Sequence, residues 1–192
     1  MNDIELINQV KKGNHEAYRF LVSQHERLVF SIAQKMTSHH QMDTEDIAQE
    51  VFIKVYKNIK SYRKESKLST WIASIAWKTS IDYVRKKTRN KIDLSEEPEI
   101  FESDFSNLTY KSIRENEIKS IVAETIARLP GHYQTVLSLY YLEEFSNKEI
   151  QEITRMPLGT IKSYLSRARN IFKTELEKHH GNNVIELLYN DK

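Results

Sequence analysis

Apolar side chains recur every three or four residues along most of this chain, a spacing that places them on one face of a helix. The pattern therefore predicts an all-helical protein. Helices are expected at residues 3–12, 17–36, 43–59, 69–89, 110–129, 132–145, 146–154 and 160–172. The period is lost over residues 92–109, which we interpret as a flexible tether between two groups of helices.

The helical pattern is clearest in the segment SNKEIQEITRMPLGTIKSYLSRARNIF. It contains two runs of apolar residues at helical spacing, separated by a short corner. Ser146 and Glu149 stand at the capping-box spacing, in which each side chain bonds an amide at the start of a helix. Pro157 removes an amide donor and Gly159 allows backbone angles that other residues resist, so both are expected to shape the corner. Thr160 is expected to cap the helix that follows.

The second helix of this segment has an apolar face and a polar, cationic face. Ile161, Leu165 and Ala168 repeat at helical spacing and are expected to face inward. The exposed face is expected to carry Lys162, Ser163, Ser166, Arg167, Asn170 and Lys173. This arrangement is typical of a DNA-reading helix-turn-helix. A plain helical hairpin with a solvated basic face is the alternative, and spacing alone leaves it open.

A second polar surface is predicted on residues 43–59. Its buried line is expected to consist of Ile47, Val51 and Val55. Another face presents Asp46, Gln49, Glu50 and Phe52. Helix capping explains acidic residues in a first turn, but it does not explain a glutamine, a glutamate and an aromatic residue near the same surface. We interpret this surface as a docking site for a basic partner.

Aromatic and cationic residues gather where the polar loop of residues 61–69 meets the next predicted helix. They are Tyr62, Arg63, Lys64, Trp71, Trp77, Lys78 and Arg85. Bases stack on aromatic rings while cations follow phosphates, so this combination suits single-stranded nucleic acid. Either tryptophan taken alone is well explained as a core residue, and that alternative stays open.

Charge is distributed unevenly, although the net formal charge is only +2. Residues 1–92 carry a basic excess, residues 93–116 an acidic excess, and residues 117–192 are balanced. Together with the lost helical period, this predicts two small helical domains, residues 1–92 and 117–178, joined by a flexible acidic linker. Residues 179–192 follow as a tail whose role the sequence does not indicate.

The composition of the 192 residues excludes several kinds of chemical site. There is no cysteine, which excludes disulfides, thiolate metal sites and cysteine nucleophiles and fits a reducing cytoplasm. No segment approaches the ~20 apolar residues of a membrane span, and the N-terminus lacks the apolar core of a signal peptide. Motifs for phosphate loops or hydrolytic catalysis are absent, and the paired histidines lack further spaced ligands. We therefore expect a cytoplasmic protein without enzymatic activity, cofactor, metal site or membrane insertion.

Three long motifs give the chain a specific resemblance. Residues 43–56, DTEDIAQEVFIKVY, resemble the helix by which sigma factors bind RNA polymerase. Their promoter-melting helix resembles STWIASIAWKTSIDYVRKKTR, residues 69–89. Their fourth conserved region resembles residues 126–169, with the marks LP, EFSNKEI and GTIKSYLSRAR. From about residue 17 to residue 176 the chain thus resembles a bacterial sigma factor of the extracytoplasmic-function (ECF) group of the sigma-70 family, which retains only the second and fourth regions.

The resemblance implies a function and a set of partners. Such a protein binds core RNA polymerase, recognises the −35 and −10 elements of a promoter and helps to melt the DNA. Residues 1–92 would be region 2 and residues 117–178 region 4. The implied partners are the β′ coiled coil and β flap of core polymerase and promoter DNA. The resemblance also admits an anti-sigma factor as a partner.

Residue roles follow from the same resemblance. Contact with the polymerase is implied for Asp46, Gln49, Glu50 and Phe52. Contact with the −10 element is implied for Tyr62, Arg63, Lys64, Trp71, Trp77, Lys78 and Arg85. Contact with the −35 element is implied for Thr160, Lys162, Ser163, Ser166, Arg167 and Lys173.

The chain departs from the family pattern at a few positions. Lys78 stands where the family often has Asn, and Tyr164 where it often has Arg. Gln134 and Gln151 replace a frequent Arg and a frequent Ala. These departures bear on the promoter sequence that is read. Two other functions stay open, a stand-alone helix-turn-helix regulator that needs no polymerase and a protein-interaction adaptor.

Overall fold

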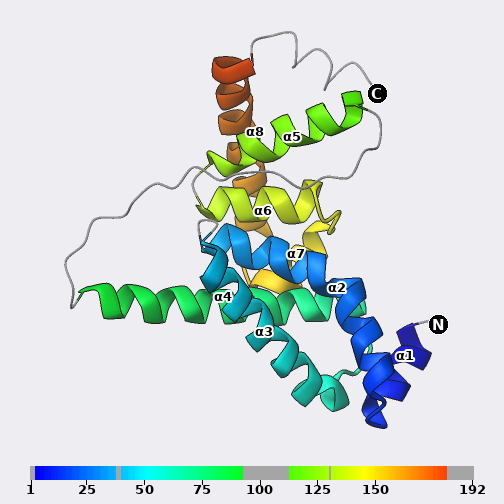
Figure 1. Cartoon of the computed structure of the whole chain (residues 1–192). Helices are drawn as coiled ribbons and strands as arrows, with labels where there is room; N and C mark the ends of the chain where they lie inside the picture. The colour runs from blue at the N-terminus through cyan, green and yellow to red at the C-terminus, as the bar shows by residue number, and fades with distance from the viewer. Residues whose placement is uncertain (1–2, 38–39, 93–112, 130, 181–192) are drawn as a thin grey trace. The chain divides into compact units, whose positions relative to one another are not determined.

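The computed structural model of the 192-residue chain describes residues 3–37, 40–92, 113–129 and 131–180 (Figure 1). Within those ranges every regular element is a helix, which confirms the predicted all-helical fold. The elements are α1 (Asp3–Lys11), α2 (His15–Met36), α3 (Gln41–Asn58), the 3-10 turn η1 (Ile59–Ser61), α4 (Leu68–Ile92), α5 (Ile113–Ala127), α6 (Gly131–Tyr141), α7 (Asn147–Thr154) and α8 (Leu158–His180).

The chain divides into two compact units. The first comprises Met1–Glu102 and Lys148–Met156, and the second comprises Ser103–Asn147 and Pro157–Lys192. The predicted linker falls largely on residues 93–112, and the tail on residues 181–192, both outside the described residues. None of the described helices combines the length and the apolar character that crossing a membrane requires.

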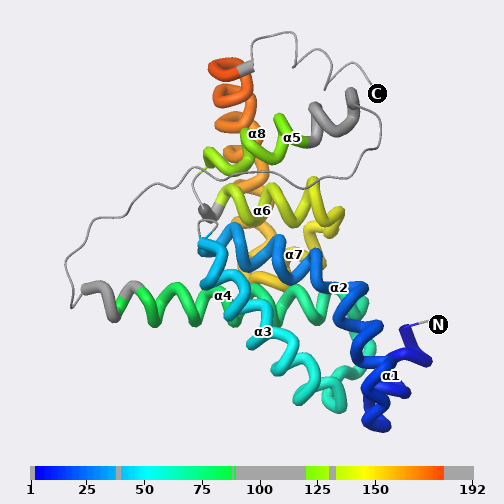
Figure 2. The backbone as a smooth tube through the Cα atoms, viewed as in Figure 1, coloured from blue at the N-terminus to red at the C-terminus, as the bar shows by residue number. Residues whose placement is uncertain are grey.

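In the first unit, α2, α3 and α4 pack against one another, and α1 packs on α2 and on η1 (Figure 2). The core side chains are fully buried and include Leu6, Leu21, Val29, Ile32, Ile47, Val51, Val55, Ile72 and Ala76. They lie at helical spacing on each element, as the apolar pattern predicts. Burial of this face accounts for most of the stability of these helices, because tertiary packing of an amphipathic face stabilises helices in proteins more than intrinsic propensity does.

Local chain chemistry fixes where these helices begin and end. Gly13 takes φ +83° directly after α1, a conformation that glycine adopts without steric penalty. Asn14 then caps α2, its side-chain oxygen accepting from the amides of Glu16 and Ala17 at 3.0 and 3.1 Å. Helix α3 begins at Gln41, two residues before the predicted start at Asp43, because His40 serves as its N-cap.

In the second unit, α6 and α8 pack against each other and α5 packs on both. Its core includes Ile126, Leu129, Val136, Leu139, Ile161, Leu165, Ala168 and Leu176. Aromatic contacts join the helices at the surface. Tyr133 and Tyr164 meet edge to face with centroids 5.4 Å apart, and Arg169 donates to the Tyr141 hydroxyl at 2.8 Å. Tyr164 thus packs against α6.

The corner between α7 and α8 differs from the prediction. Gly159 lies inside α8 and does not adopt a positive φ, and Thr160 lies in the first turn of α8 instead of capping it. The left-handed conformation falls on Arg155, with φ +61°. Helix α8 begins at Leu158, directly after Pro157, whose fixed φ suits the start of a helix. The expected roles of Gly159 and Thr160 in the corner were therefore wrong.

Candidate functional site

The outer face of α3 carries three of the four residues predicted to dock a partner. Asp46, Gln49 and Glu50 are exposed and lie at i, i+3 and i+4, so they share one side of the helix. Phe52 is half-buried at the edge of this face. Glu50 pairs with Lys54 at 2.7 Å, which offsets its charge in part. The face is therefore polar at its centre, with an aromatic border.

Sequence reasoning missed the apolar side chains on the same face. Met42 is 73% exposed, Ile53 47% and Tyr56 40%. Their spacing from Gln49 places them in line with it, on the side opposite the buried Ile47 and Val51. The signal was present in the sequence, because Ile53 stands seven residues after Asp46. We call Met42, Asp46, Gln49, Ile53 and Tyr56 the α3 stripe.

Helix α2 supports one border of the α3 stripe. The Tyr18 hydroxyl donates to the backbone carbonyl of Phe52 at 2.6 Å, and its ring meets that of Tyr56 edge to face at 4.9 Å. Burial raises the pKa of Tyr18 to about 12, and the neighbouring Tyr56 adds to this effect. The Tyr18 hydroxyl therefore stays protonated as a donor at neutral pH.

The exposed face of α4 brings together three of the seven residues predicted near the −10 element. Trp71, Lys78 and Arg85 lie seven residues apart, so they form a line along the helix with Trp71 half-buried and the two cations exposed. Trp77 lies on another side of the helix and is only 6% exposed. The structure places Trp77 in the core, the alternative that the sequence left open.

The loop that precedes α4 is organised around Tyr62, which is only 7% exposed. Its hydroxyl donates to the carbonyl of Ser66 at 2.6 Å, its carbonyl accepts from Lys11 Nζ at 3.2 Å, and its ring lies 5.3 Å from that of Trp71. Arg63 and Lys64 are exposed, and Lys64 takes φ +63°. Tyr62 therefore fixes the loop from inside while the two cations point to solvent.

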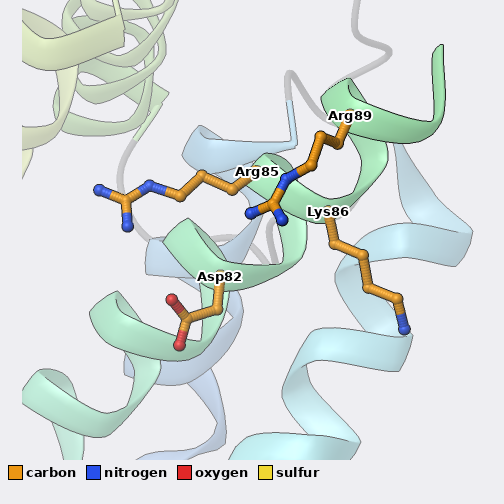
Figure 3. Close-up of a pocket in the computed structure, with 4 residues that line it drawn as sticks. All are labelled: Asp82, Arg85, Lys86 and Arg89. Carbon is orange, nitrogen blue, oxygen red and sulfur yellow. The ribbon is translucent and has the colours of Figure 1, made fainter. Parts of the chain in front are cut away.

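A hollow of about 360 Å³ lies along the second half of α4 and is lined by Asp82, Arg85, Lys86 and Arg89. Figure 3 shows the guanidinium groups of Arg85 and Arg89 beside this hollow, while Lys86 points away from Asp82. Among the described residues, no ion pair joins Asp82 to any of the three cations. The hollow is thus a predominantly cationic surface whose charges are available to an anion.

One buried carboxylate links α3 to α4. Asp43 accepts from the Tyr83 hydroxyl at 2.9 Å and from Lys87 Nζ, and its side chain is 12% exposed. Burial acts to raise the pKa of Asp43, but hydrogen bonds from Lys87 and Tyr83 outweigh it and hold the pKa below its ordinary value. Lys87 is consequently engaged within the unit, unlike the cations around the hollow.

The exposed face of α8 carries the residues predicted to read duplex DNA. Lys162, Ser166, Arg167 and Lys173 are exposed, whereas Thr160 and Ser163 are half-buried. The buried face contains Ile161, Leu165 and Ala168, as predicted. Most of the polar positions therefore lie on the surface of one helix.

No candidate metal site is found within the described residues. They contain no group of three or more histidine, aspartate or glutamate side chains that could hold a metal ion. Burial lowers the pKa of His25, and an Asp3 carboxylate acts against this effect, but neither lies on the surfaces above. The surfaces are suited to recognition of a partner and of nucleic acid.

Comparison with known proteins identifies both halves of the chain. Residues 21–90 match the family described as Sigma-70 region 2, and residues 119–170 match Sigma-70, region 4. The chain is 32% identical to the "ECF RNA polymerase sigma factor SigW" of Bacillus subtilis, over 88% of this chain and 94% of the relative. It is also 32% identical to the "ECF RNA polymerase sigma-E factor" of Haemophilus influenzae, over 92% and 96%.

Solved structures with the same fold include two proteins, each in complex with another protein. The Bartonella quintana sigma factor RpoE, crystallised with the anti-sigma factor NepR, aligns with a TM-score of 0.67 at 22% identity, covering 85% of this chain and 98% of that one. CnrH in complex with the cytosolic domain of CnrY aligns with a TM-score of 0.62 at 18% identity, covering 92% and 98%.

Proposed function

Because this chain belongs to the ECF group of the sigma-70 family, whose members direct promoter-specific initiation by RNA polymerase and are not enzymes, we propose that its separate surfaces divide that task. The α3 stripe binds core polymerase, the loop before α4 and the outer face of α4 engage the −10 region, and the exposed face of α8 in the region 4 helix-turn-helix reads the −35 element. Core polymerase and promoter DNA are the partners that family membership implies.

The α3 stripe supports the assignment of core binding through its composition. Asp46, Gln49 and Glu50 supply acceptors for a basic surface, and Ile53 supplies apolar area beside them. Protein interfaces combine polar and apolar surface in this way. We assign the stripe and Phe52 to the β′ coiled coil, and the region 4 unit to the β flap.

The residues predicted near the −10 element differ in exposure, which supports different roles for them. Arg63, Lys64, Lys78 and Arg85 are exposed cations and are assigned to phosphates and base edges, and the partly exposed ring of Trp71 to an unstacked base. Extruding a base costs a few kcal/mol, which stacking must offset. Tyr62 and Trp77 are assigned the task of holding the loop and α4 in place for those contacts. The hollow at Arg85 adds Arg89 as a phosphate contact.

For the −35 element, Lys162, Ser166 and Arg167 are assigned to base edges in the major groove and Lys173 to a phosphate. Arg or Lys to guanine is the commonest specific contact in that groove. Thr160 and Ser163 are partly covered and are assigned hydroxyl contacts at the margin. Lys173 is weakly paired with Glu177 at 3.9 Å on an exposed surface, so it can turn to a phosphate at little cost.

A regulatory partner is also proposed. The similar RpoE of Bartonella quintana was crystallised with an anti-sigma factor, and an anti-sigma protein would restrain this chain by covering the surfaces that core polymerase needs. Both activities would take place in the cytoplasm, where core polymerase is found.

The test is transcription in vitro from promoters selected out of random DNA, with purified core polymerase and with or without the protein. The double variant Lys162→Ala/Arg167→Ala should lose −35 recognition, at ~1–3 kcal/mol for each good base contact removed, and keep core binding. The variant Gln49→Ala/Glu50→Ala should lose core binding and keep duplex binding. Initiation that never depends on the protein would refute the proposal, and DNA binding without any core binding would favour a stand-alone regulator.

A further inference from the structure

Lys54 on α3 connects the proposed polymerase surface to the neighbouring helix α4. Its ammonium group pairs with the Glu50 carboxylate at 2.7 Å, one turn earlier on α3. The same nitrogen donates to the hydroxyl of Thr79 on α4 at 3.1 Å. One side chain therefore bonds both to an exposed carboxylate beside the α3 stripe and to a residue of the next helix.

Thr79 is a firm anchor for this lysine. It is only 2% exposed and lies in the middle of α4, which packs along α3. A buried hydroxyl is costly to leave without a hydrogen bond, which favours retention of the bond from Lys54. The Lys54 side chain is 38% exposed, so most of it is covered by the protein.

A surface pair without such an anchor shows the difference. The Arg19–Glu16 pair on α2 has side chains that are 81% and 80% exposed. Pairs of that kind contribute little to stability, because two long side chains lose rotamer freedom when they meet and solvent screens their charges. In the Glu50–Lys54 pair, Thr79 already holds the lysine, so only the glutamate has to be ordered.

The Glu50 carboxylate remains accessible to a partner. Its side chain is 50% exposed, and its Oε1 atom accepts from Lys54. A carboxylate can accept several hydrogen bonds, so the second oxygen can accept from a basic side chain of a partner at the same time. A carboxylate that is already in place loses less conformational freedom on binding.

The charge of Lys54 does not suit direct contact with the same partner. The neighbouring polar side chains Asp46, Gln49 and Glu50 are suited to a basic surface, which a lysine ammonium would repel. Orientation of Glu50 explains a lysine at this position, and contact with a basic partner does not.

We infer that Lys54, anchored by Thr79, is a positioning residue that holds the Glu50 carboxylate in place for core polymerase. The inference rests on the proposed binding of core polymerase by the α3 stripe and the adjoining Glu50. It assigns to a buried threonine of α4 an effect on binding at a surface of α3.

Ser80 is a matched control on the same helix. It is fully buried, and its hydroxyl donates to the carbonyl of Ala76 at 2.8 Å. This hydrogen bond stays within α4, as is usual for a hydroxyl in a helix. Ser80→Ala therefore removes a buried hydroxyl next to Thr79 without touching the bond to Lys54.

The experiment measures the affinity of the full-length protein for purified core polymerase by titration. Thr79→Val keeps the shape of the side chain and removes the hydroxyl, and Thr79→Ser keeps the hydroxyl. Fixing one flexible side chain changes affinity by about 2- to 10-fold, so Thr79→Val should bind core about 3-fold more weakly. Thr79→Ser and Ser80→Ala should both bind core as the native protein does.

Combination with Glu50→Ala separates positioning from a general effect on the fold. Once the carboxylate is absent, Thr79→Val should cause no further loss of affinity, so the two substitutions should be non-additive. A general loss of packing in α4 would weaken binding by the same factor whether or not Glu50 is present. Thermal unfolding of each variant shows whether it remains folded.

A second measurement tests the anchor in the free protein. Nitrogen NMR relaxation should show the Lys54 ammonium to be more ordered than that of the exposed Lys57. The difference should disappear in Thr79→Val and persist in Thr79→Ser. Equal mobility of the two ammonium groups in the native protein would overturn the inference.

The binding data overturn the inference if Thr79→Val matches the native protein, or if Thr79→Ser or Ser80→Ala binds as weakly as Thr79→Val. Equal weakening by Thr79→Val with and without Glu50 would also overturn it. Failure of the proposed polymerase surface would look different, because Glu50→Ala and Ile53→Asp would then each bind core as tightly as the native protein. That result would remove the basis of the inference as well.

Discussion

Replacing Asp43 by Asn tests the link between α3 and α4 with almost no change of shape. The Asp43 carboxylate accepts from the Tyr83 hydroxyl at 2.9 Å and from Lys87, and its side chain is 12% exposed. The Asn side chain retains one acceptor oxygen for Tyr83, but it lacks the negative charge of the carboxylate. Its amide nitrogen, which is a donor, would face the Lys87 ammonium group. Lys87 is 41% exposed, so it regains much of its hydration when the carboxylate is gone.

The expected loss of unfolding free energy at pH 7 is about 1.5–3 kcal/mol, the range for hydrogen bonds to a charged group. The lower half of that range is favoured, because the exposure of Lys87 screens its share of the interaction. Asp46→Asn is the matched control. It makes the same chemical change three residues further along α3 at an exposed position, and it should cost less than ~0.5 kcal/mol.

Urea unfolding followed by tryptophan fluorescence is the assay, because both tryptophans of the chain lie on α4 and report on the first unit. The pKa of Asp43 is lowered on folding, since the bonds from Lys87 and Tyr83 outweigh burial. A lowered pKa contributes stability that is complete above the unfolded-state value of about 3.9 and is lost as the pH falls through the folded-state value. The difference between native protein and Asp43→Asn should therefore be constant from pH 7 to 5 and shrink below about pH 4. A difference under ~0.5 kcal/mol at pH 7, or one that persists undiminished at pH 3, would refute the reasoning.

Three further substitutions test other contacts. Ile53→Asp should weaken core-polymerase binding at least tenfold, measured by co-purification and titration, while thermal unfolding stays near native because the side chain is exposed. Tyr18→Phe should cost about 1 kcal/mol at pH 7 by removing the bond to the Phe52 carbonyl. Because the Tyr18 pKa is raised to about 12, that cost should vanish as the pH rises from 10 through 12 in alkaline unfolding. Trp77→Ala should cost about 3–5 kcal/mol of unfolding free energy, whereas Trp71→Ala should cost less and chiefly weaken binding of single-stranded −10 DNA.

The helical fold could be predicted from the sequence because its signal is local. Residues such as Ile47, Val51 and Val55 repeat at the helical period, and each proved buried. The outer face of α3 followed from the same period, so Asp46, Gln49 and Glu50 were placed on the surface correctly. Ile53 was not identified from the sequence, although the helical period places it on the same outer face.

Features that depend on tertiary contacts could not be predicted from the helical period of the sequence. Trp77 and Tyr62 are aromatic residues of the kind found in nucleic-acid sites, yet packing against neighbouring elements buries them. The Asp43–Lys87 pair joins residues 44 apart in sequence, which no periodicity reveals. The corner was assigned to Gly159 by intrinsic preference, while hydrogen bonds around Thr154 force the left-handed angle onto Arg155.

Helix α1 shows that the first folding unit is larger than the segment that matches the region 2 family. The match to sigma-70 region 2 starts at residue 21, but Leu6, Ile7 and Val10 are buried against α2 and η1. Burying three such side chains stabilises a domain by about 5 kcal/mol or more, a large part of a typical total. Lys11 also holds the carbonyl of Tyr62 at 3.2 Å, which ties α1 to the loop before α4. A protein truncated at the family boundary would therefore lose both stability and the fixed shape of its −10 loop, and region 2 of this chain should be isolated with its first twenty residues attached.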